Sequence, residues 1–451
     1  MEEAIAAAAT GGGRAAIGVI RLSGAGCIQA LSRIFFPKNG AAFSDSPPRT
    51  MVYGRLFDRD GRLIDLALAF CCPAPHSYTG EDTAELHCHG SPTLLAMAMD
   101  ALLAQGVRLA QPGEFTRRAF LNGKLDLTQA EGVADLIDAP SPSAVRAASR
   151  QLGGALSQLT NEVYQSLLEL AAHFHATVDY PDEDLDPFGR EDVEKALENA
   201  DQSLARLLGS YRRGQMIARG IPCTLVGRPN VGKSSLLNAL LGYDRAIVTQ
   251  IPGTTRDTLE ELCQLGGVAL RLTDTAGLRD TDDQVERLGV ERSRRALAEC
   301  ELALAVVDGS QPLTPEDQAV LALAAQAPRA LCLLNKADLP PAFSSEGLPL
   351  PALRVSARTG LGLERLEQEV TRLFPQGDEG EVFLSNPRQY AAAMAAQEAL
   401  GRAREALSAG LPIDLPLLDV EAAMAALGEL TGRSVREDVV DQIFSRFCLG
   451  K

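Results

Sequence analysis

The chain has 451 residues, 46% of them hydrophobic, and carries 43 basic against 59 acidic side chains, a formal net charge of -16. A chain of this length suggests about two to four domains. Because the net charge repels phosphate backbones, any contact with nucleic acid must be local or assisted by a partner protein.

The cellular compartment of the protein is predicted from features that the sequence does not contain. Its apolar runs are too short or too interrupted to cross a bilayer. The first ten residues carry Glu2 and Glu3 and lack the basic lead and cleavage pattern of a secretory signal. Nine cysteines are scattered without a CxxC pair, which favours a reducing compartment. We therefore expect a soluble cytoplasmic protein.

Four segments differ in their pattern. Residues 1–120 alternate short apolar runs with Gly and Pro turns, which predicts an α+β domain. Residues 121–217 contain fewer Gly and Pro residues and show apolar residues at helical spacing. Residues 218–375 alternate apolar strands with helical stretches, as in a parallel sheet covered by helices. Residues 376–451 are helical again, so the α/β segment is predicted to be inserted into one helical domain.

A phosphate-binding loop follows the apolar run 223–226. The sequence from Gly227 to Ser234 reads GRPNVGKS, a full GxxxxGKS match that leads into a helix beginning near Ser235. Backbone N–H groups of such a loop wrap the phosphates, Lys233 neutralises their charge, and the Ser234 hydroxyl binds magnesium. A plain glycine turn is the much weaker alternative in this strand-loop-helix context.

Further motifs follow in the order expected of a guanine-nucleotide site. Residues 274–277 read DTAG, where a carboxylate at a strand end can hold magnesium through water and Gly277 approaches the γ-phosphate. Residues 335–338 read NKAD, in which Asp338 can accept from both donors of guanine, a pair that adenine lacks. Ser356 and Ala357 complete the base pocket. The four motifs together predict magnesium-dependent GTP hydrolysis.

Between the phosphate motifs, 254–257 supplies a threonine, assigned as Thr255, that can cap magnesium while the γ-phosphate is present. Residues 249–253 would form the mobile loop around it, a plain surface loop being the alternative. The complete set assigned to GTP is Asn230, Val231, Gly232, Lys233, Ser234, Ser235, Thr249, Gln250, Ile251, Pro252, Gly253, Thr254, Thr255, Asp274, Thr275, Ala276, Gly277, Asn335, Lys336, Ala337, Asp338, Ser356 and Ala357.

Hydrolysis needs a group that orients the attacking water. Ras-like GTPases place a glutamine after DTAG, but this chain has Leu278 there, which cannot form a hydrogen bond through its side chain. Glu286 is a candidate, and from the residues alone it competes with Asp282 and Asp283. A solvated acidic stretch is the simpler interpretation of this segment.

No arginine finger can be assigned, so charge growing on the phosphates needs another counter-ion. The side-chain oxygen of Asn230, the backbone carbonyls of Thr249 and Ile251, and an oxygen of Thr254 can cage a monovalent cation where a finger would lie. This potassium site is a hypothesis.

These motifs, with others outside the nucleotide site, resemble the MnmE (TrmE) family of tRNA-modification GTPases over essentially the whole chain. The additional motifs are IGVIRLSG at 17–24, SYTGED at 77–82, PGEFTRRAFLNGKLDL at 112–127, AEGVADLIDA at 130–139 and FCLGK at 447–451. Leu449 departs from the usual FCIGK of the family, a change of shape and not of chemistry.

The resemblance implies a multidomain fold: an α+β N-terminal tetrahydrofolate-binding domain that forms a homodimer, an all-α helical domain in two segments, and an inserted α/β P-loop, Ras-like G domain. It implies a heterotetramer-type complex with the flavoprotein MnmG. The two proteins together modify the 5 position of the wobble uridine in certain tRNAs, using a folate-borne one-carbon unit. It also implies potassium-dependent association of G domains, with Glu286 as the catalytic glutamate.

In the family's site for 5-formyl-tetrahydrofolate or a related folate, the matching positions are Arg21, Glu85, Lys124 and Lys451. A basic group can pair with the glutamyl tail, and a carboxylate can accept from the pterin donors. Which residue plays which part stays open, and each would otherwise be an ordinary surface charge. Cys448 is a candidate for the modification site, or an unremarkable thiol.

Two other functions compete with this interpretation. A ribosome-assembly GTPase of the Era or EngA kind shares much of the nucleotide site, but no KH-type GXXG loop in a basic context and no second GKS is present. A dimerising signalling switch is the third possibility. Two basic pairs, Arg117-Arg118 and Arg212-Arg213, either touch tRNA or belong to solvated helix faces.

Overall fold

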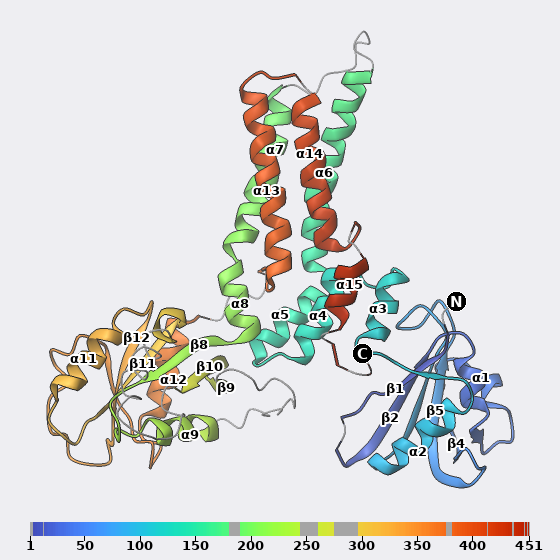
Figure 1. The fold of residues 1–451 in the computed structure, drawn as a ribbon, viewed down its shortest axis with the longest axis horizontal. Helices are drawn as coiled ribbons and strands as arrows, with labels where there is room; N and C mark the ends of the chain where they lie inside the picture. The colour runs from blue at the N-terminus through green and yellow to red at the C-terminus, as the bar shows by residue number, and fades with distance from the viewer. Residues whose placement is uncertain are drawn as a thin grey trace. The chain divides into compact units, whose positions relative to one another are not determined.

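The computed structural model describes residues 3–11, 13–179, 190–243, 260–274, 296–375, 381–412, 414–434, 437–445, 447–448 and 450 (Figure 1). The chain divides into two compact units. Unit 1 comprises Met1–Ala134, Ser157–Leu168 and Glu421–Lys451, and unit 2 comprises Asp135–Leu156 and Glu169–Val420. Among the described residues, no helix combines the length and the apolar character that a membrane span requires.

Unit 1 is built on a seven-stranded sheet with the order β3-β4-β5-β6-β2-β1-β7. β1 pairs in parallel with β7, and the other neighbours are antiparallel. Along β5, Ala67, Ala69 and Cys71 are buried while Leu66 and Leu68 on the other face are exposed. The strands are β1 (Ile5–Ala8), β2 (Ala15–Ser23), β3 (Phe35–Pro37), β4 (Val52–Phe57), β5 (Leu63–Cys72), β6 (Thr83–Gly90) and β7 (Arg108–Leu109).

Two helices, α1 (Cys27–Ser32) and α2 (Pro92–Leu103), pack against this sheet, and a short 3-10 turn spans Phe43–Asp45. Their buried residues, including Leu31 and Leu102, join the alternating core of the strands because a sheet must bury one apolar face. This confirms the α+β fold expected for the N-terminal segment.

A buried ion cluster ties the following helix, α3 (Glu114–Leu121), to the sheet region. The Arg118 guanidinium, with its side chain 2% exposed, donates to Glu81 at 3.0 Å and to Glu114 at 2.9 Å. Burial raises the pKa of Glu114, but hydrogen bonds from Arg108, the Gln111 backbone and Arg118 outweigh it and lower that pKa to about 2. Glu114 is therefore charged at neutral pH and compensates the buried arginine.

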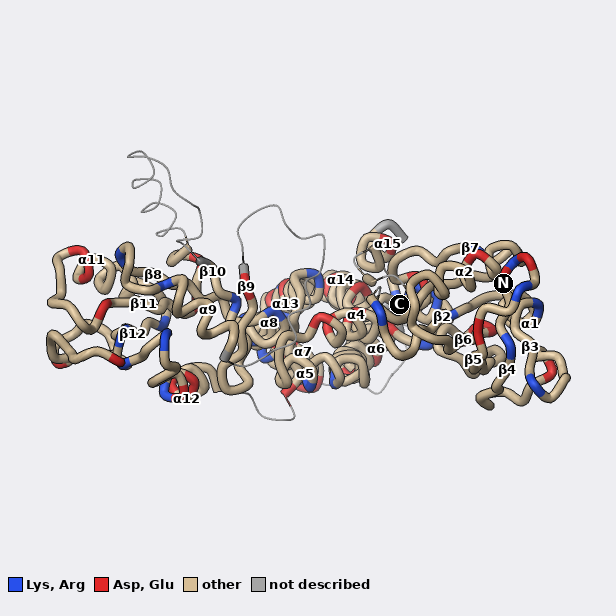
Figure 2. Tube along the Cα trace, turned by 90° about the horizontal axis from the view of Figure 1, so that it is seen from below, with Lys and Arg blue, Asp and Glu red and all other residues tan. Residues whose placement is uncertain are grey.

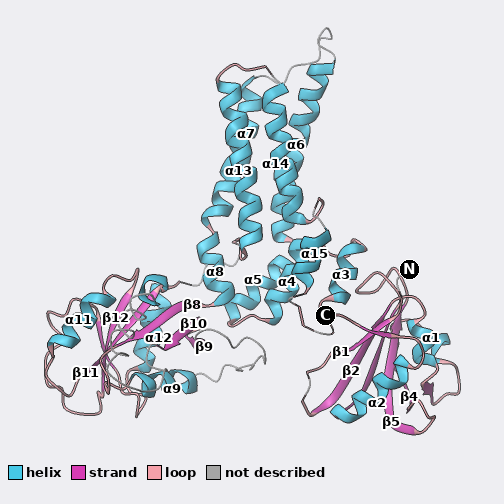
Figure 3. Ribbon diagram, in the orientation of Figure 1, coloured by secondary structure: helices cyan, strands magenta, loops and turns pink. Residues whose placement is uncertain are grey.

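The remaining helices confirm the expected all-α part of the chain (Figure 3). α7 and α13 lie side by side, with alanines on the buried face of α13 and an Asp201 carboxylate that accepts from Arg404 at 2.7 Å. Helices α6 and α14 each contribute residues to both units. The helices are α4 (Leu127–Ile137), α5 (Pro142–Leu152), α6 (Ala155–Asp179), α7 (Arg190–Gly209), α8 (Tyr211–Arg219), α13 (Pro387–Ser408), α14 (Asp414–Thr431) and α15 (Glu437–Phe444).

Between α8 and α13 the chain forms a six-stranded sheet with the order β13-β12-β11-β8-β10-β9. Only β9 is antiparallel to its neighbour among these described strands. The strands are β8 (Ile221–Val226), β9 (Glu260–Leu265), β10 (Val268–Asp274), β11 (Leu302–Asp308), β12 (Ala330–Asn335) and β13 (Ala352–Arg354), and the helices are α9 (Lys233–Tyr243), α11 (Pro315–Ala324) and α12 (Leu363–Leu373).

Both faces of this second sheet are covered. Leu302, Leu304 and Val306 of β11 belong to one hydrophobic cluster, and the alternate residues Ala303, Ala305 and Val307 belong to another. Successive side chains of a strand point to opposite faces, so β11 is buried on both sides, as a parallel sheet between helices requires. This confirms the inserted α/β domain.

Candidate functional site

The phosphate-binding loop leaves the buried strand β8 and ends at the first turn of α9. Gly232 has φ +95°, and a Cβ there would collide with the amide of Asn335, so only glycine fits. The Lys233 ammonium donates to the carbonyls of Gly227 at 2.8 Å and Arg228 at 2.9 Å. The loop thus folds around its own lysine, which begins α9, and the exposed Ser234 follows in the first turn of that helix.

Asn335 connects this loop to the base-binding segments. Its side-chain amide donates to the Val231 carbonyl at 2.9 Å, and its Oδ1 accepts from the Ala357 backbone N–H at 3.1 Å. One buried side chain therefore joins three of the predicted motifs, because it ends β12 next to the phosphate-binding loop. These predicted site residues lie together.

The predicted base-recognition carboxylate is held from two sides. The Ser356 hydroxyl donates to Asp338 Oδ1 at 2.6 Å, and Arg358, with a side chain 78% exposed, contacts Oδ2 at 2.8 Å. The Ser356 hydrogen bond lowers the pKa of Asp338, so the carboxylate is charged and acts as an acceptor. This is the state that the two donors of guanine require.

Sequence reasoning missed Asp308, which ends the buried strand β11 beside Asn335. Its Oδ2 accepts from the Lys336 ammonium at 2.7 Å and its Oδ1 from the Ser310 hydroxyl at 2.6 Å. Burial raises the pKa of Asp308, but these bonds, above all that from Lys336, outweigh it and lower the pKa. An aspartate at the end of an apolar run was the available signal, as at Asp274.

Several predicted positions lie outside the described residues: Thr249, Gln250, Ile251, Pro252, Gly253, Thr254, Thr255, Thr275, Ala276, Gly277, Glu286 and Lys451. Asp274 is described through its backbone, which pairs with Leu225 next to the end of β8. That register brings the end of β10 alongside the strand that carries the phosphate-binding loop.

In unit 1, the structure brings together two residues of the predicted folate set. Arg21 on β2 faces Glu85 on β6, with 2.9 Å from Nε to Oε1. A guanidinium N–H of Arg21 also donates to the Gly450 carbonyl at 3.5 Å. The C-terminal segment thus reaches the sheet at this pair, while Glu85 Oε2 contacts His87 at 3.2 Å.

Aromatic rings lie around the Arg21 guanidinium. Its carbon is 5.8 Å from the centroid of Tyr78 and 5.9 Å from that of Phe115. Lys124, which is exposed, lies against Gly80, two residues after that tyrosine. No role was predicted for Tyr78 or Phe115, although both belong to the motifs SYTGED and PGEFTRRAFLNGKLDL.

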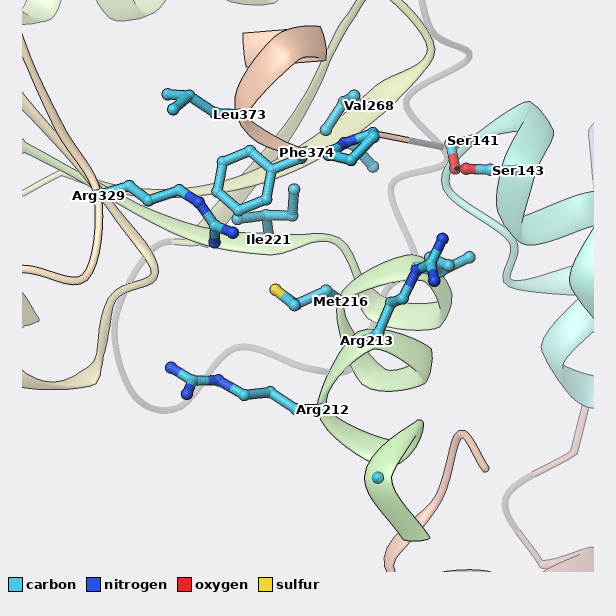
Figure 4. Close-up of a pocket in the computed structure, with 14 residues that line it drawn as sticks. Ser141, Ser143, Arg212, Arg213, Met216, Ile221, Val268, Arg329, Leu373 and Phe374 are labelled. Carbon is cyan, nitrogen blue, oxygen red and sulfur yellow. Dashed lines mark hydrogen bonds between the residues drawn. The ribbon is translucent and has the colours of Figure 1, made fainter. Parts of the chain in front are cut away.

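The two basic pairs of the sequence are engaged in ion pairs. Arg117 contacts Asp441 at 3.0 Å, and its neighbour belongs to the buried cluster. Arg212 contacts Glu301 at 2.6 Å and Arg213 contacts Glu381 at 2.6 Å. These last two arginines project from α8 into a cavity of about 400 Å³ (Figure 4), which none of the predicted site residues lines. These contacts lower the positive charge that either pair offers to RNA.

The base-recognition geometry yields a test. Replacing Asp338 by asparagine (Asp338→Asn) places an amide donor against the donors of guanine, so we expect GTP affinity to fall roughly 100-fold. Xanthosine triphosphate, whose ring offers an acceptor there, should bind the variant better than GTP does. Titration with fluorescent nucleotides measures both, and unchanged GTP affinity would contradict the assignment. Arg358→Ala, which removes an exposed ion pair, is the control and should change affinity less than about fivefold.

Two family models match along the chain. A family model described as "GTP-binding protein TrmE N-terminus" matches residues 4–124, and one described as "MnmE helical domain" matches residues 127–448. Among solved structures, Aquifex aeolicus Era bound to GDP.AlF4- is 23% identical, with a TM-score of 0.27, over 39% of this chain and 65% of its own. A structural similarity of that size identifies nothing by itself.

Curated relatives match along their full length. The tRNA modification GTPase MnmE of Symbiobacterium thermophilum is 46% identical over 455 residues, covering 100% of both chains. That of Chloroflexus aurantiacus is 44% identical over 459 residues, again with 100% of each covered. The chain therefore belongs to the MnmE family of tRNA modification GTPases and is an enzyme that binds and hydrolyses GTP.

Proposed function

We propose that this GTPase acts with the flavoprotein MnmG on the wobble uridine of certain tRNAs, adding a carboxymethylaminomethyl or aminomethyl group at the 5 position with a folate-borne one-carbon unit. The observation that supports it best is the full-length similarity to tRNA modification GTPases, which includes the segments outside the nucleotide site. GTP hydrolysis drives conformational change and not the carbon chemistry.

Within this proposal, GTP binds at the loops that β8, β10 and β12 carry. Lys233 and the backbone N–H groups of the loop hold the phosphates, while Asp338 and Ser356 read the base. Ser234 and Thr255 bind magnesium, which neutralises the β- and γ-phosphate charge. The described oxygen of Ser234 fits that role because it is exposed at the first turn of α9.

Glu286 is proposed to position the attacking water, directly or through a second water. Potassium would supply positive charge beside the phosphates, held by Asn230, Thr249, Ile251 and Thr254. Of these ligands the structure describes Asn230, whose φ of 64° is unusual for a residue other than glycine. An asparagine tolerates this conformation, and its amide oxygen suits a hard monovalent cation.

The folate is proposed to bind at Arg21, Glu85, Lys124 and Lys451 in the N-terminal domain. The Arg21–Glu85 pair, with its side chains 23% and 20% exposed, offers both a cation and an acceptor at one place. The rings of Tyr78 and Phe115 beside the guanidinium would contact a flat pterin or benzoyl ring.

We further propose the domain limits 1–120, 121–217, 218–375 and 376–451, in which the first segment forms the homodimer contact and the two helical segments form one domain. The homodimer would associate with MnmG in a heterotetramer-type complex. The matched ranges 4–124 and 127–448 support a boundary near residue 120.

A deletion strain tests the function itself. Mass spectrometry of tRNA nucleosides should show loss of the wobble-uridine group in the strain and its return with the wild-type gene. A Glu286→Ala gene should not restore it, because hydrolysis is required. Normal modification in the deletion strain would contradict the proposal and favour an RNA-assembly switch.

The potassium site predicts a dependence on the monovalent cation. GTP hydrolysis should be roughly tenfold or more faster in potassium than in sodium, because one counter-ion at the phosphates is worth at least that much. Asn230→Gly keeps the positive-φ backbone and removes the oxygen, so it should reduce this ratio toward one. Rubidium, close in size to potassium, serves as the control. Equal rates in sodium and potassium in the wild type would exclude the site.

For the folate site, calorimetric titration of 5-formyl-tetrahydrofolate should show saturable binding. Arg21→Ala should weaken it roughly 10- to 100-fold, because a charged hydrogen bond is lost. Arg62→Ala removes an arginine that is 79% exposed and should leave the affinity unchanged. A thermal melt of each variant checks its folding. Absence of wild-type binding at millimolar ligand would refute the assignment while leaving GTP hydrolysis intact.

A further inference from the structure

Four basic side chains meet at the β3–β4 end of the unit 1 sheet. Arg33, Lys38, Arg55 and Arg59 line an open cavity of about 660 Å³, which is called the basic cavity below. They come from the turn after α1, the turn after β3, the middle of β4 and the loop after β4, so the tertiary fold gathers them. Figure 2 shows basic residues along this part of the trace.

The charge of the basic cavity is largely uncompensated. Within the described chain, neither Arg33, Lys38 nor Arg55 forms an ion pair with a carboxylate, and each is exposed. Arg59 contacts Asp60 at 3.8 Å, a loose pair between two exposed side chains that contributes little. The lining carboxylate of Asp58 accepts the backbone N–H groups of Asp60 and Arg62 instead.

This sets the cavity apart from the basic pairs at Arg117-Arg118 and Arg212-Arg213, whose charges meet carboxylates at 2.6 to 3.0 Å. The whole chain has a net charge of -16. A polyanion therefore gains most where cations remain uncompensated, since the rest of the surface repels it.

Aromatic rings accompany the cations. Phe36 on the edge strand β3 is 50% exposed and is braced by Phe57, with ring centroids 5.4 Å apart in an edge-to-face contact. Phe36 pairs across the strands with Arg55, and the Lys38 ammonium lies 4.7 Å from the ring centroid of Tyr53. Rings beside a basic groove are how proteins hold single-stranded RNA, by stacking bases and contacting phosphates.

We propose that the basic cavity is a tRNA contact of this chain, in which Arg33, Lys38, Arg55 and Arg59 hold backbone phosphates and Phe36 stacks on an unpaired base. This inference rests on the proposed action on tRNA, and it adds the surface of the chain that binds the tRNA. A free anion would explain the cations alone, whereas RNA would also use Phe36, which pairs across the strands with Arg55 and is exposed beside it.

The test is binding of fluorescently labelled, unmodified tRNA to the full chain, followed by anisotropy at several salt concentrations. Each phosphate contact contributes about 0.7 to 0.9 to the slope of log affinity against log salt. Lys38→Ala/Arg55→Ala should therefore reduce that slope by about 1.5 and weaken binding roughly 30-fold at about 0.1 M salt. Phe36→Ala should weaken binding roughly fivefold or more without changing the slope.

The matched control is Arg14→Ala/Arg146→Ala, which removes two exposed arginines elsewhere in the chain. The control therefore has the same net charge as the Lys38→Ala/Arg55→Ala variant. It should change tRNA affinity less than about threefold, and GTP hydrolysis without RNA, with a thermal melt, checks that every variant is folded. An equal loss in control and test variants, or no loss in either, overturns the proposal.

Two further outcomes would also overturn it. One is wild-type protein that binds vesicles of phosphatidylglycerol but no tRNA. The other is wild-type protein that binds no tRNA even at low salt. Neither outcome would contradict the proposed modification function, because nucleoside analysis of the deletion strain tests that function separately.

Discussion

The parallel pairing of β8 with β10 and β11 is the constraint on which the nucleotide site depends. Parallel strands end at one edge of the sheet, so loops distant in sequence meet there. The register places Asp274 beside Leu225 and Asp308 beside Asn335, at the ends of four neighbouring strands. Without that register the phosphate-binding loop, the end of β10 and the segments that follow β12 would remain separate pieces of chain.

At this edge, side-chain hydrogen bonds hold the loops to one another. Asn335 holds both the Val231 carbonyl and the Ala357 N–H, and Ser356 holds Asp338. Loops fixed in this way lose less conformational freedom on binding, which leaves more of the contact energy as affinity. The glycine at 232 is required for the same reason, since its missing side chain makes room for the Asn335 amide.

The acidic chain uses many of its arginines internally. Arg118 and Arg108 compensate Glu114, and Arg21 compensates Glu85. Burying a charged group is costly unless it is paired, so each of these cations lies beside a carboxylate. Positive charge available to an outside partner is therefore concentrated where arginines and lysines lack an ion pair, as Arg33, Lys38 and Arg55 do in the described part of the basic cavity.

The sequence alone determined the domain types, the nucleotide and the base preference, because GKS, DTAG and NKAD place particular donors and acceptors at fixed spacing, and periodicity separates strands from helices. The family resemblance supplied Arg21 and Glu85 as candidates, but no local pattern pairs β2 with β6. Only the tertiary structure gave that contact, the role of Asp308, and the neutralised state of Arg118 and Arg212. Long-range strand register and charge compensation decide these features, and neither is encoded in any short stretch of residues.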